Sequence, residues 1–172
     1  MHVPASYEYP NAPYFAEYLN FEADENLFEV LNNQFNELIE IFENAGNGQA
    51  DKAYAPGKWS LKGLLGHMVD TERIVSYRVL AISRGEKTPL PGFDENEYQA
   101  ASEYETQEVA AIVTQYKATR AATLALLHSF STKHWNQMGE ANGKKTSARA
   151  WAWMIAGHEK HHLTIMKERY LA

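Results

Sequence analysis

The chain of 172 residues carries 16 Lys and Arg against 22 Asp and Glu, which gives a formal charge of −6, and it contains seven histidines but no cysteine. The lack of cysteine excludes disulfides, Cys-ligated zinc or iron–sulfur sites and a Cys nucleophile, so any metal site must be built from imidazole, carboxylate and water. The acidic balance, without a basic stripe, argues against nucleic acid as a partner.

No stretch of the sequence approaches the ~20 apolar residues of a membrane span, and the N-terminus lacks the basic and apolar pattern of a signal peptide. We therefore expect a cytoplasmic protein with no membrane partner. At this length, with 45% hydrophobic and 22% charged residues, a single domain over residues 1–172 is expected. Residues 1–23 are expected to be an extended segment, because three prolines within the first 13 residues restrict the backbone.

Apolar residues at spacings of three and four predict four long helices. The first begins near Asp24, a residue suited to capping a helix, and ends at the glycine-rich sequence 46–48. The second follows a Pro-Gly turn, is capped by Ser60 and ends near Gly85.

The third predicted helix opens at Ser102, where Glu105 three residues on completes a capping-box pattern, and runs to Phe130. The fourth begins near Thr146 or Ser147 and continues almost to the C-terminus. With no alternating strand pattern in the sequence, these helices predict an all-α protein with the fold of a four-helix bundle.

The connection between the second and third helices, residues 85–101, is too long for a tight turn. We expect it to cross over the bundle end and to break a simple up-down-up-down order. Phe93, Asp94 and Tyr98 are the residues within it that could cover a pocket, although a packed surface loop is the alternative interpretation.

The last predicted helix places His158 and His162 one turn apart, a spacing at which two imidazoles can bind one metal ion. Both lie on the seam between Ile155 and Ile165, where an apolar core residue would be usual, so they must be hydrogen-bonded or coordinated. His161 could replace His162 as a ligand, but its less apolar stripe favours a position at the rim of the site.

A third histidine, His67, interrupts the apolar face of the second predicted helix. Gly63 and Gly66 stand beside it, and each lowers helix stability by about 1 kcal/mol relative to Ala. Close approach of a neighbouring helix or of a ligand would explain these glycines. A hydrogen-bonded core histidine is the alternative for His67 alone, but the three histidines together favour a metal site.

Four segments carry a resemblance to a known family: Trp59-Ser60, the sequence HMVDTER at 67–73, LPGFD at 90–94 and GHEKHH at 157–162. They resemble the DinB-like superfamily of metal-binding four-helix bundles, which includes thiol S-transferases that use low-molecular-weight thiols. The resemblance covers the second helix to the C-terminus.

The resemblance implies a bundle with a crossover, commonly a homodimer, that holds a divalent ion such as nickel or zinc through three histidines. In this sequence they correspond to His67, His158 and His162. It also implies a small-molecule substrate and, as in the thiol S-transferases of the family, a low-molecular-weight thiol as a second one. Without cysteine in the chain, any thiol must arrive with the substrate.

Three imidazoles leave coordination positions open, as catalytic sites do. A coordinated thiol would lose its proton and a coordinated water would become more acidic, so the function predicted is that of a metal-dependent enzyme, a thiol S-transferase or a hydrolase. Asp70 is the candidate general base, with Glu159 and Asp94 as weaker options. The alternatives are a non-catalytic, stress-related bundle that binds a metal or ligand, and a structural protein with hydrogen-bonded histidines.

Proton competition for the imidazole nitrogens predicts that metal affinity falls below about pH 6.5, the ordinary pKa of histidine.

Overall fold

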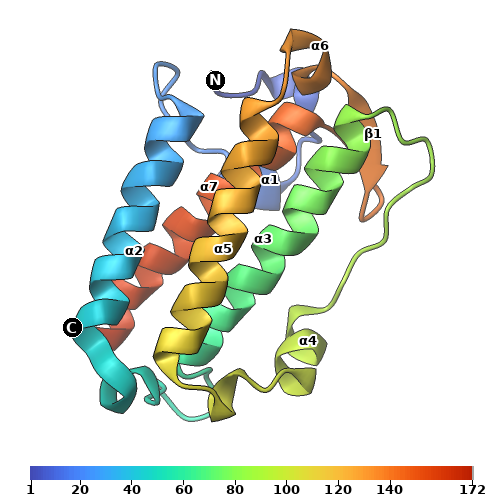
Figure 1. Ribbon diagram of the computed structural model, residues 1–172. Helices are drawn as coiled ribbons and strands as arrows, with labels where there is room; N and C mark the ends of the chain where they lie inside the picture. Colours follow the sequence, from blue (N-terminus) through green and yellow to red (C-terminus); the bar gives the residue numbers. More distant parts are fainter. Residues whose placement is uncertain (172) are drawn as a thin grey trace.

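The computed structural model describes residues 1–171 and has four long helices packed against one another (Figure 1). They are α2 (Leu27–Ala50), α3 (Leu61–Ser83), α5 (Val109–His128) and α7 (Ala148–Ile165). The most extensive contacts join α3 to α7 and to α5. The predicted all-α four-helix bundle is confirmed.

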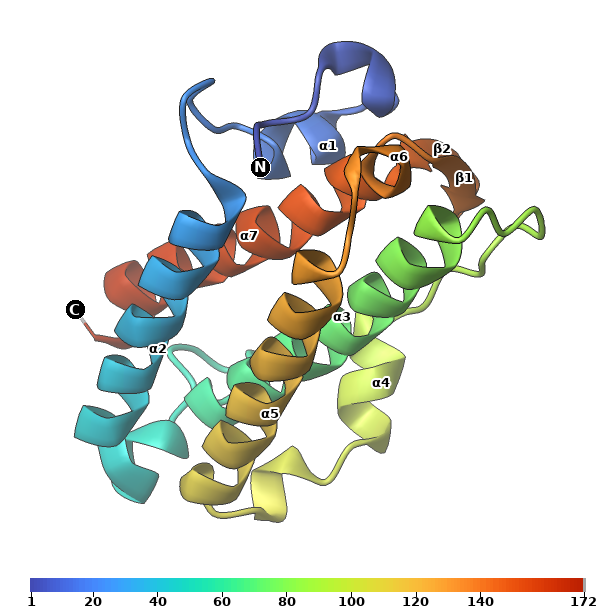
Figure 2. The ribbon, with the colours of Figure 1, turned by 45° about the horizontal axis from the view of Figure 1, so that its top comes forward.

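The long crossover lies on the side of the bundle (Figures 1 and 2). It leaves the C-terminal end of α3 and runs back beside the bundle. It contains α4 (Glu95–Ala101) and the short turn η2 (Tyr104–Thr106) before α5 starts. Because α3 and α5 run in the same direction, the expected break in up-down-up-down order is confirmed. The connection does not cross over the bundle end, as we expected, but returns along the side of α3 (Figures 1 and 2).

Two of the predicted helix starts are confirmed by their caps. The hydroxyl oxygens of Ser60 and Ser147 accept hydrogen bonds from backbone N–H groups three residues on, at 3.0 and 2.9 Å. The first long helix is capped by Asn26 rather than Asp24, and it continues through residues 46–48 with a kink at Gly46, where φ is 58°.

The predicted start of the third helix at Ser102 is wrong, because α5 begins at Val109. Ser102 instead ends α4, and its hydroxyl donates a hydrogen bond to a carbonyl of that helix. Glu105 does not complete a capping box with Ser102, since its carboxylate accepts hydrogen bonds from the hydroxyl of Ser60 at 2.9 and 2.7 Å. The apparent capping pair therefore serves to hold the crossover against the start of α3.

The N-terminal segment, expected to be extended, contains the turn η1 (Ser6–Glu8) and the short helix α1 (Pro13–Tyr18), so the expectation is wrong for those residues. Pro13 occupies the first helical position, where a missing N–H leaves no hydrogen bond unmade.

A β-hairpin, which the sequence analysis did not predict, lies between the short helix α6 (Thr132–Trp135) and α7. Its strands β1 (Met138–Ala141) and β2 (Lys144–Ser147) are antiparallel. Asn142 and Gly143 join them with φ of 52° and 67°, the backbone of the tight turns that Asn-Gly favours.

The core consists of two apolar clusters separated by a polar layer. Each of the four long helices passes from one cluster to the other along its length. At the crossing point each contributes buried polar residues: Gln34; Thr71 and Glu72; Thr119, Arg120 and Thr123; Glu159 and His162. The candidate site lies at this layer. Within residues 1–171, no helix combines the length and apolar character that a membrane span requires.

Candidate metal centre

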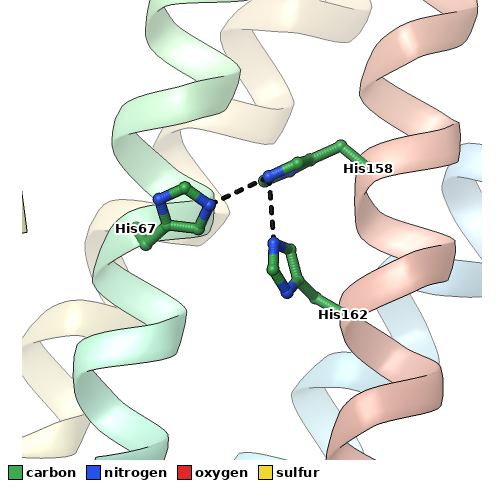
Figure 3. A group of neighbouring side chains, drawn as sticks. All are labelled: His67, His158 and His162. Carbon is green, nitrogen blue, oxygen red and sulfur yellow. Dashed lines mark hydrogen bonds between the residues drawn. The ribbon is translucent and has the colours of Figure 1, made fainter. Parts of the chain in front are cut away.

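Three histidines from α3 and α7 point toward one another (Figure 3). The Nε2 atom of His158 lies 3.0 Å from Nε2 of His67 and 3.0 Å from Nε2 of His162. A set of ligand atoms, one from each residue, lies within 4.8 Å of one another. The structure thus brings together the three residues singled out in the sequence.

The two nitrogen separations of 3.0 Å fit ligands of a shared metal ion. Two nitrogens bound to one ion at 2.0–2.1 Å lie roughly 2.9–3.4 Å apart, according to the angle between the two bonds. Imidazole nitrogen is a donor that zinc, nickel, copper and iron all accept. In chemistry and in spacing, the three histidines therefore fit a divalent transition metal.

Burial keeps these imidazoles uncharged. It lowers the pKa of His67 to about 4 and that of His162 to about 3, and it holds the pKa of His158 well below its usual range. Metal ions bind the neutral imidazole, so at neutral pH the protonation state is the one that coordination needs.

The second ring nitrogen of His162, Nδ1, is buried and has no hydrogen-bond partner within residues 1–171. His161 lies outside the cluster, with Nδ1 3.3 Å from a carboxylate oxygen of Glu17 and its ring 5.3 Å from that of Tyr18. It therefore stands at the rim, and the geometry gives no support to His161 in place of His162.

None of the three carboxylates considered as a base is presented to the histidines. Asp70 accepts a hydrogen bond from the hydroxyl of Tyr104 at 2.8 Å and from Arg73 at 3.2 Å. Asp94 caps α4, where it accepts from two backbone N–H groups at 2.8 and 3.0 Å.

Glu159 belongs to a buried ion-pair network next to the site. The guanidinium of Arg120, 2% exposed, donates to Glu159 at 2.6 Å and to Glu72 at 2.8 Å. Tyr116 donates a further hydrogen bond to Glu159. The carboxylate is thereby engaged in joining α7 to α3 and α5.

A cavity of about 460 Å³ lies against the three histidines. Trp59, with its ring 4.9 Å from that of His67, and Tyr18, 5.9 Å from His158, form its walls near the cluster. Glu95, the first residue of α4, supplies a carboxylate to the wall, and its charge opposes the effect of burial on the pKa of His67. Glu95 is not among the site residues predicted from the sequence, although Asp94 beside it is a helix-capping residue that could have revealed α4.

Glycines allow the elements around the site to approach closely. A Cβ on Gly66 would lie 2.2 Å from the ring of Tyr104, and one on Gly63 would lie 2.5 Å from Glu105. The close approach inferred from these glycines is confirmed, but the neighbour is the crossover rather than a long helix or a ligand.

Gly157, directly before His158, has a similar role for α1. A Cβ at this position would lie 1.8 Å from the carbonyl oxygen of Tyr18. The missing side chain lets the end of α1 rest on α7, and this contact brings Tyr18 to the cavity.

Together, the bundle, the crossover and the three-histidine cluster beneath a cavity define a helical protein with a candidate metal centre. A family model described as the DinB superfamily matches residues 31–166. The chain belongs to this superfamily, as its motifs predicted.

Two solved structures share the fold. The first, described as "YfiT from Bacillus subtilis is a probable metal-dependent hydrolase with an unusual four-helix bundle topology", is 15% identical, with 95% of each chain covered and a TM-score of 0.75. The second, a mycothiol-dependent maleylpyruvate isomerase, is 18% identical with a TM-score of 0.67, and the match covers 82% of this chain and 60% of the isomerase. Identities this low show the fold alone. No curated protein sequence matches the chain.

Proposed function

We propose that this protein binds a divalent metal ion through His67, His158 and His162 and is a metal-dependent enzyme acting on a small molecule. The observation that carries the proposal is the convergence of three neutral imidazoles on one point beside a cavity of about 460 Å³. Closed structural zinc sites use four protein ligands, whereas three leave room for water or substrate.

The finer proposal rests on what the resemblance to this family implies. Nickel or zinc is the proposed ion, thiol S-transfer or hydrolysis the proposed reaction, and a homodimer the proposed assembly. The description of YfiT as a probable metal-dependent hydrolase supports hydrolysis, and the mycothiol dependence of the isomerase supports chemistry with a small thiol. Because this chain has no cysteine, the thiol would be a co-substrate.

The residues around the cavity have separable tasks in this proposal. A bound metal would act as a Lewis acid and lower the pKa of a water or thiol that reaches it. Glu95 is the carboxylate on the cavity wall and would accept a proton from a molecule held there. Tyr18, whose pKa burial raises to about 12, keeps its proton and with Trp59 limits the access of water.

A substrate screen with a matched pair of variants tests catalysis. The metal-loaded protein is incubated with hydrolysable esters and amides, and with small thiols plus electrophiles. We expect turnover that His162→Ala abolishes and that His161→Ala, one residue away at the rim, retains. Turnover unchanged in His162→Ala would contradict catalysis at this site, and metal binding without turnover would favour the non-catalytic alternative.

A further inference from the structure

The cavity over the histidines has a wall of buried hydrogen-bond donors without partners. Thr71 Oγ1, Arg78 Nε and Trp151 Nε1 are each buried and lack a hydrogen-bond partner within residues 1–171. The three residues are 6%, 5% and 2% exposed, and all of them line this cavity. Buried polar groups are nearly always satisfied, so three unsatisfied donors in one cavity call for an explanation.

Arg78 carries a buried charge that the protein leaves unbalanced. Within the described chain no carboxylate comes within 4.0 Å of its guanidinium, whereas the equally buried Arg120 is paired with two carboxylates. A buried arginine is normally paired, because removing a charge from water is costly. Glu95 also lines the cavity but is not among the carboxylates within 4.0 Å of a cation in the described residues.

The guanidinium of Arg78 is held in a defined position. It lies over the ring of Trp151 at 4.7 Å and over that of Phe93 at 5.8 Å, and Nη2 donates to the carbonyl oxygen of Pro91 at 3.0 Å. These contacts fix the orientation of the guanidinium. Of its five N–H donors, the one on Nε has no acceptor. A preorganised donor set of this kind binds a ligand with little loss of side-chain entropy.

We propose that Arg78, Trp151 and Thr71 form a subsite for a carboxylate group of the substrate. A carboxylate only accepts hydrogen bonds, which matches a set of donors, and guanidinium–carboxylate pairs are strong and directional. Its single negative charge balances the one buried cation, whereas a phosphate dianion would leave excess charge in the buried wall. The exposed Lys144 also lines the cavity and adds a second positive charge there.

The placement of the subsite sets the size of the substrate. Thr71 lies one helical turn after His67, about 6 Å along the axis of α3. Arg78 lies eleven residues after His67, about 16 Å along the same axis. The guanidinium of Arg78 lies over the ring of Trp151, which precedes His158 by seven residues on α7, about 10 Å along that helix axis. The inference rests on the proposed function and narrows it: the substrate is a small organic acid whose carboxylate binds at Arg78 while its reacting end lies at the histidines.

Titration with a carboxylate probe tests this subsite without any turnover. Butyrate is added to the metal-loaded and to the metal-free protein, and the side-chain Nε–H resonance of Arg78 is followed by nuclear magnetic resonance. We expect a saturable shift of this resonance, and we expect Arg78→Gln to weaken butyrate binding at least about tenfold. Arg73→Gln, an exposed arginine on the same helix, is the matched control and should bind as the wild type does.

Trp151→Phe provides a second variant that keeps an aromatic ring but removes the unpaired N–H. We expect a several-fold loss of butyrate affinity. Because Trp151 is 2% exposed, the smaller side chain also lowers Tm, and thermal unfolding is recorded to show that the variant is folded at the temperature of the titration. Equal affinity in wild type, Arg78→Gln and Trp151→Phe would overturn the subsite, and inorganic phosphate that binds more tightly than butyrate would overturn the carboxylate assignment.

The two proposals fail in different ways. Arg78-dependent butyrate binding by a chain that takes up no metal would refute the metal-dependent function and support the subsite. Metal uptake by a chain whose butyrate binding does not depend on Arg78 would refute the subsite and support the metal-dependent function.

Discussion

The histidines of the cluster differ from exposed histidines in their pKa, and this difference changes the expected pH dependence of metal binding. From the ordinary pKa, affinity is expected to fall below about pH 6.5. Burial lowers the pKa of His67 to about 4 and that of His162 to about 3. Protons therefore begin to compete only at much lower pH, and the sequence-based expectation is revised downward.

We predict that the affinity for nickel or zinc stays nearly constant from pH 7 to about pH 5 and falls as the pH approaches 4. The fall comes from protonation of the ligands, since a protonated imidazole cannot coordinate. Calorimetric titrations over a pH series measure it. A steep loss that starts at pH 6.5 would show that the ligands are solvent-exposed histidines.

Arg120 joins α3, α5 and α7 through buried charges, and its replacement should destabilise the whole bundle. Arg120→Met would leave Glu72 and Glu159 buried without their cation, which typically costs ~3–5 kcal/mol. Urea unfolding measures the loss. Lys117→Met on the same helix removes an exposed pair with Glu43 and should change the free energy of unfolding by less than ~1 kcal/mol. Equal effects of the two substitutions would contradict a structural role for the network.

Contact between α1 and α7 depends on one missing side chain. Gly157→Ala would place a methyl group where the carbonyl oxygen of Tyr18 lies, so we predict that α1 separates from α7 with a loss of ~1–3 kcal/mol or more. Hydrogen exchange of residues 13–18 should become faster. Gly48→Ala is the control, because a Cβ there meets nothing within 4 Å. Unchanged exchange in Gly157→Ala would mean that α1 is held by other contacts.

Local signals in the sequence predicted the elements that depend on local physics. Ser60 and Ser147 each precede an apolar helical stripe and cap the helix that follows, as serine commonly does at this position. His158 and His162 lie four residues apart, so they share one face of α7 regardless of what that helix packs against. The capping-box pattern at Ser102 predicted a helix start wrongly, because Glu105 accepts a hydrogen bond from Ser60, 45 residues away, and not from the backbone near Ser102. Pairing of that kind is decided by tertiary structure.

Other residues of the site could be identified only from the three-dimensional structure. Glu95, Arg78 and Trp151 come from three different elements, and no spacing in the sequence indicates that they share a cavity. Asp70, the base suggested by its place one turn after His67, is instead turned toward Tyr104 in the crossover. By contrast, the hairpin could have been predicted, since Asn142-Gly143 is a strong local turn signal.

At the scale of the whole molecule, the candidate metal ligands connect α3 and α7, the two helices with the most extensive mutual contacts. They do so at the polar layer between the two apolar clusters. A ligand that binds only the folded chain raises its stability by RT ln(1 + [L]/Kd), about 2.7 kcal/mol at 100 times Kd. For a protein of this size each kcal/mol raises Tm by ~2–4 °C. We therefore predict that a chelator lowers Tm by roughly 5–10 °C.

Differential scanning calorimetry with and without chelator measures this shift. In His67→Ala the chelator should have no effect on Tm, because the link between α3 and α7 is already lost. A chelator effect of the same size in this variant and in the wild type would place the stabilising ion elsewhere in the molecule.

The most direct test of the three-histidine site is the metal content of the untagged protein, measured by elemental analysis after loading with nickel or zinc and desalting. We predict about one ion per chain in the wild type and in His161→Ala, whose imidazole stands at the rim. In His158→Ala, which removes the central nitrogen of the cluster, the bound metal should be lost. Full metal content in His158→Ala would contradict the assignment of this site.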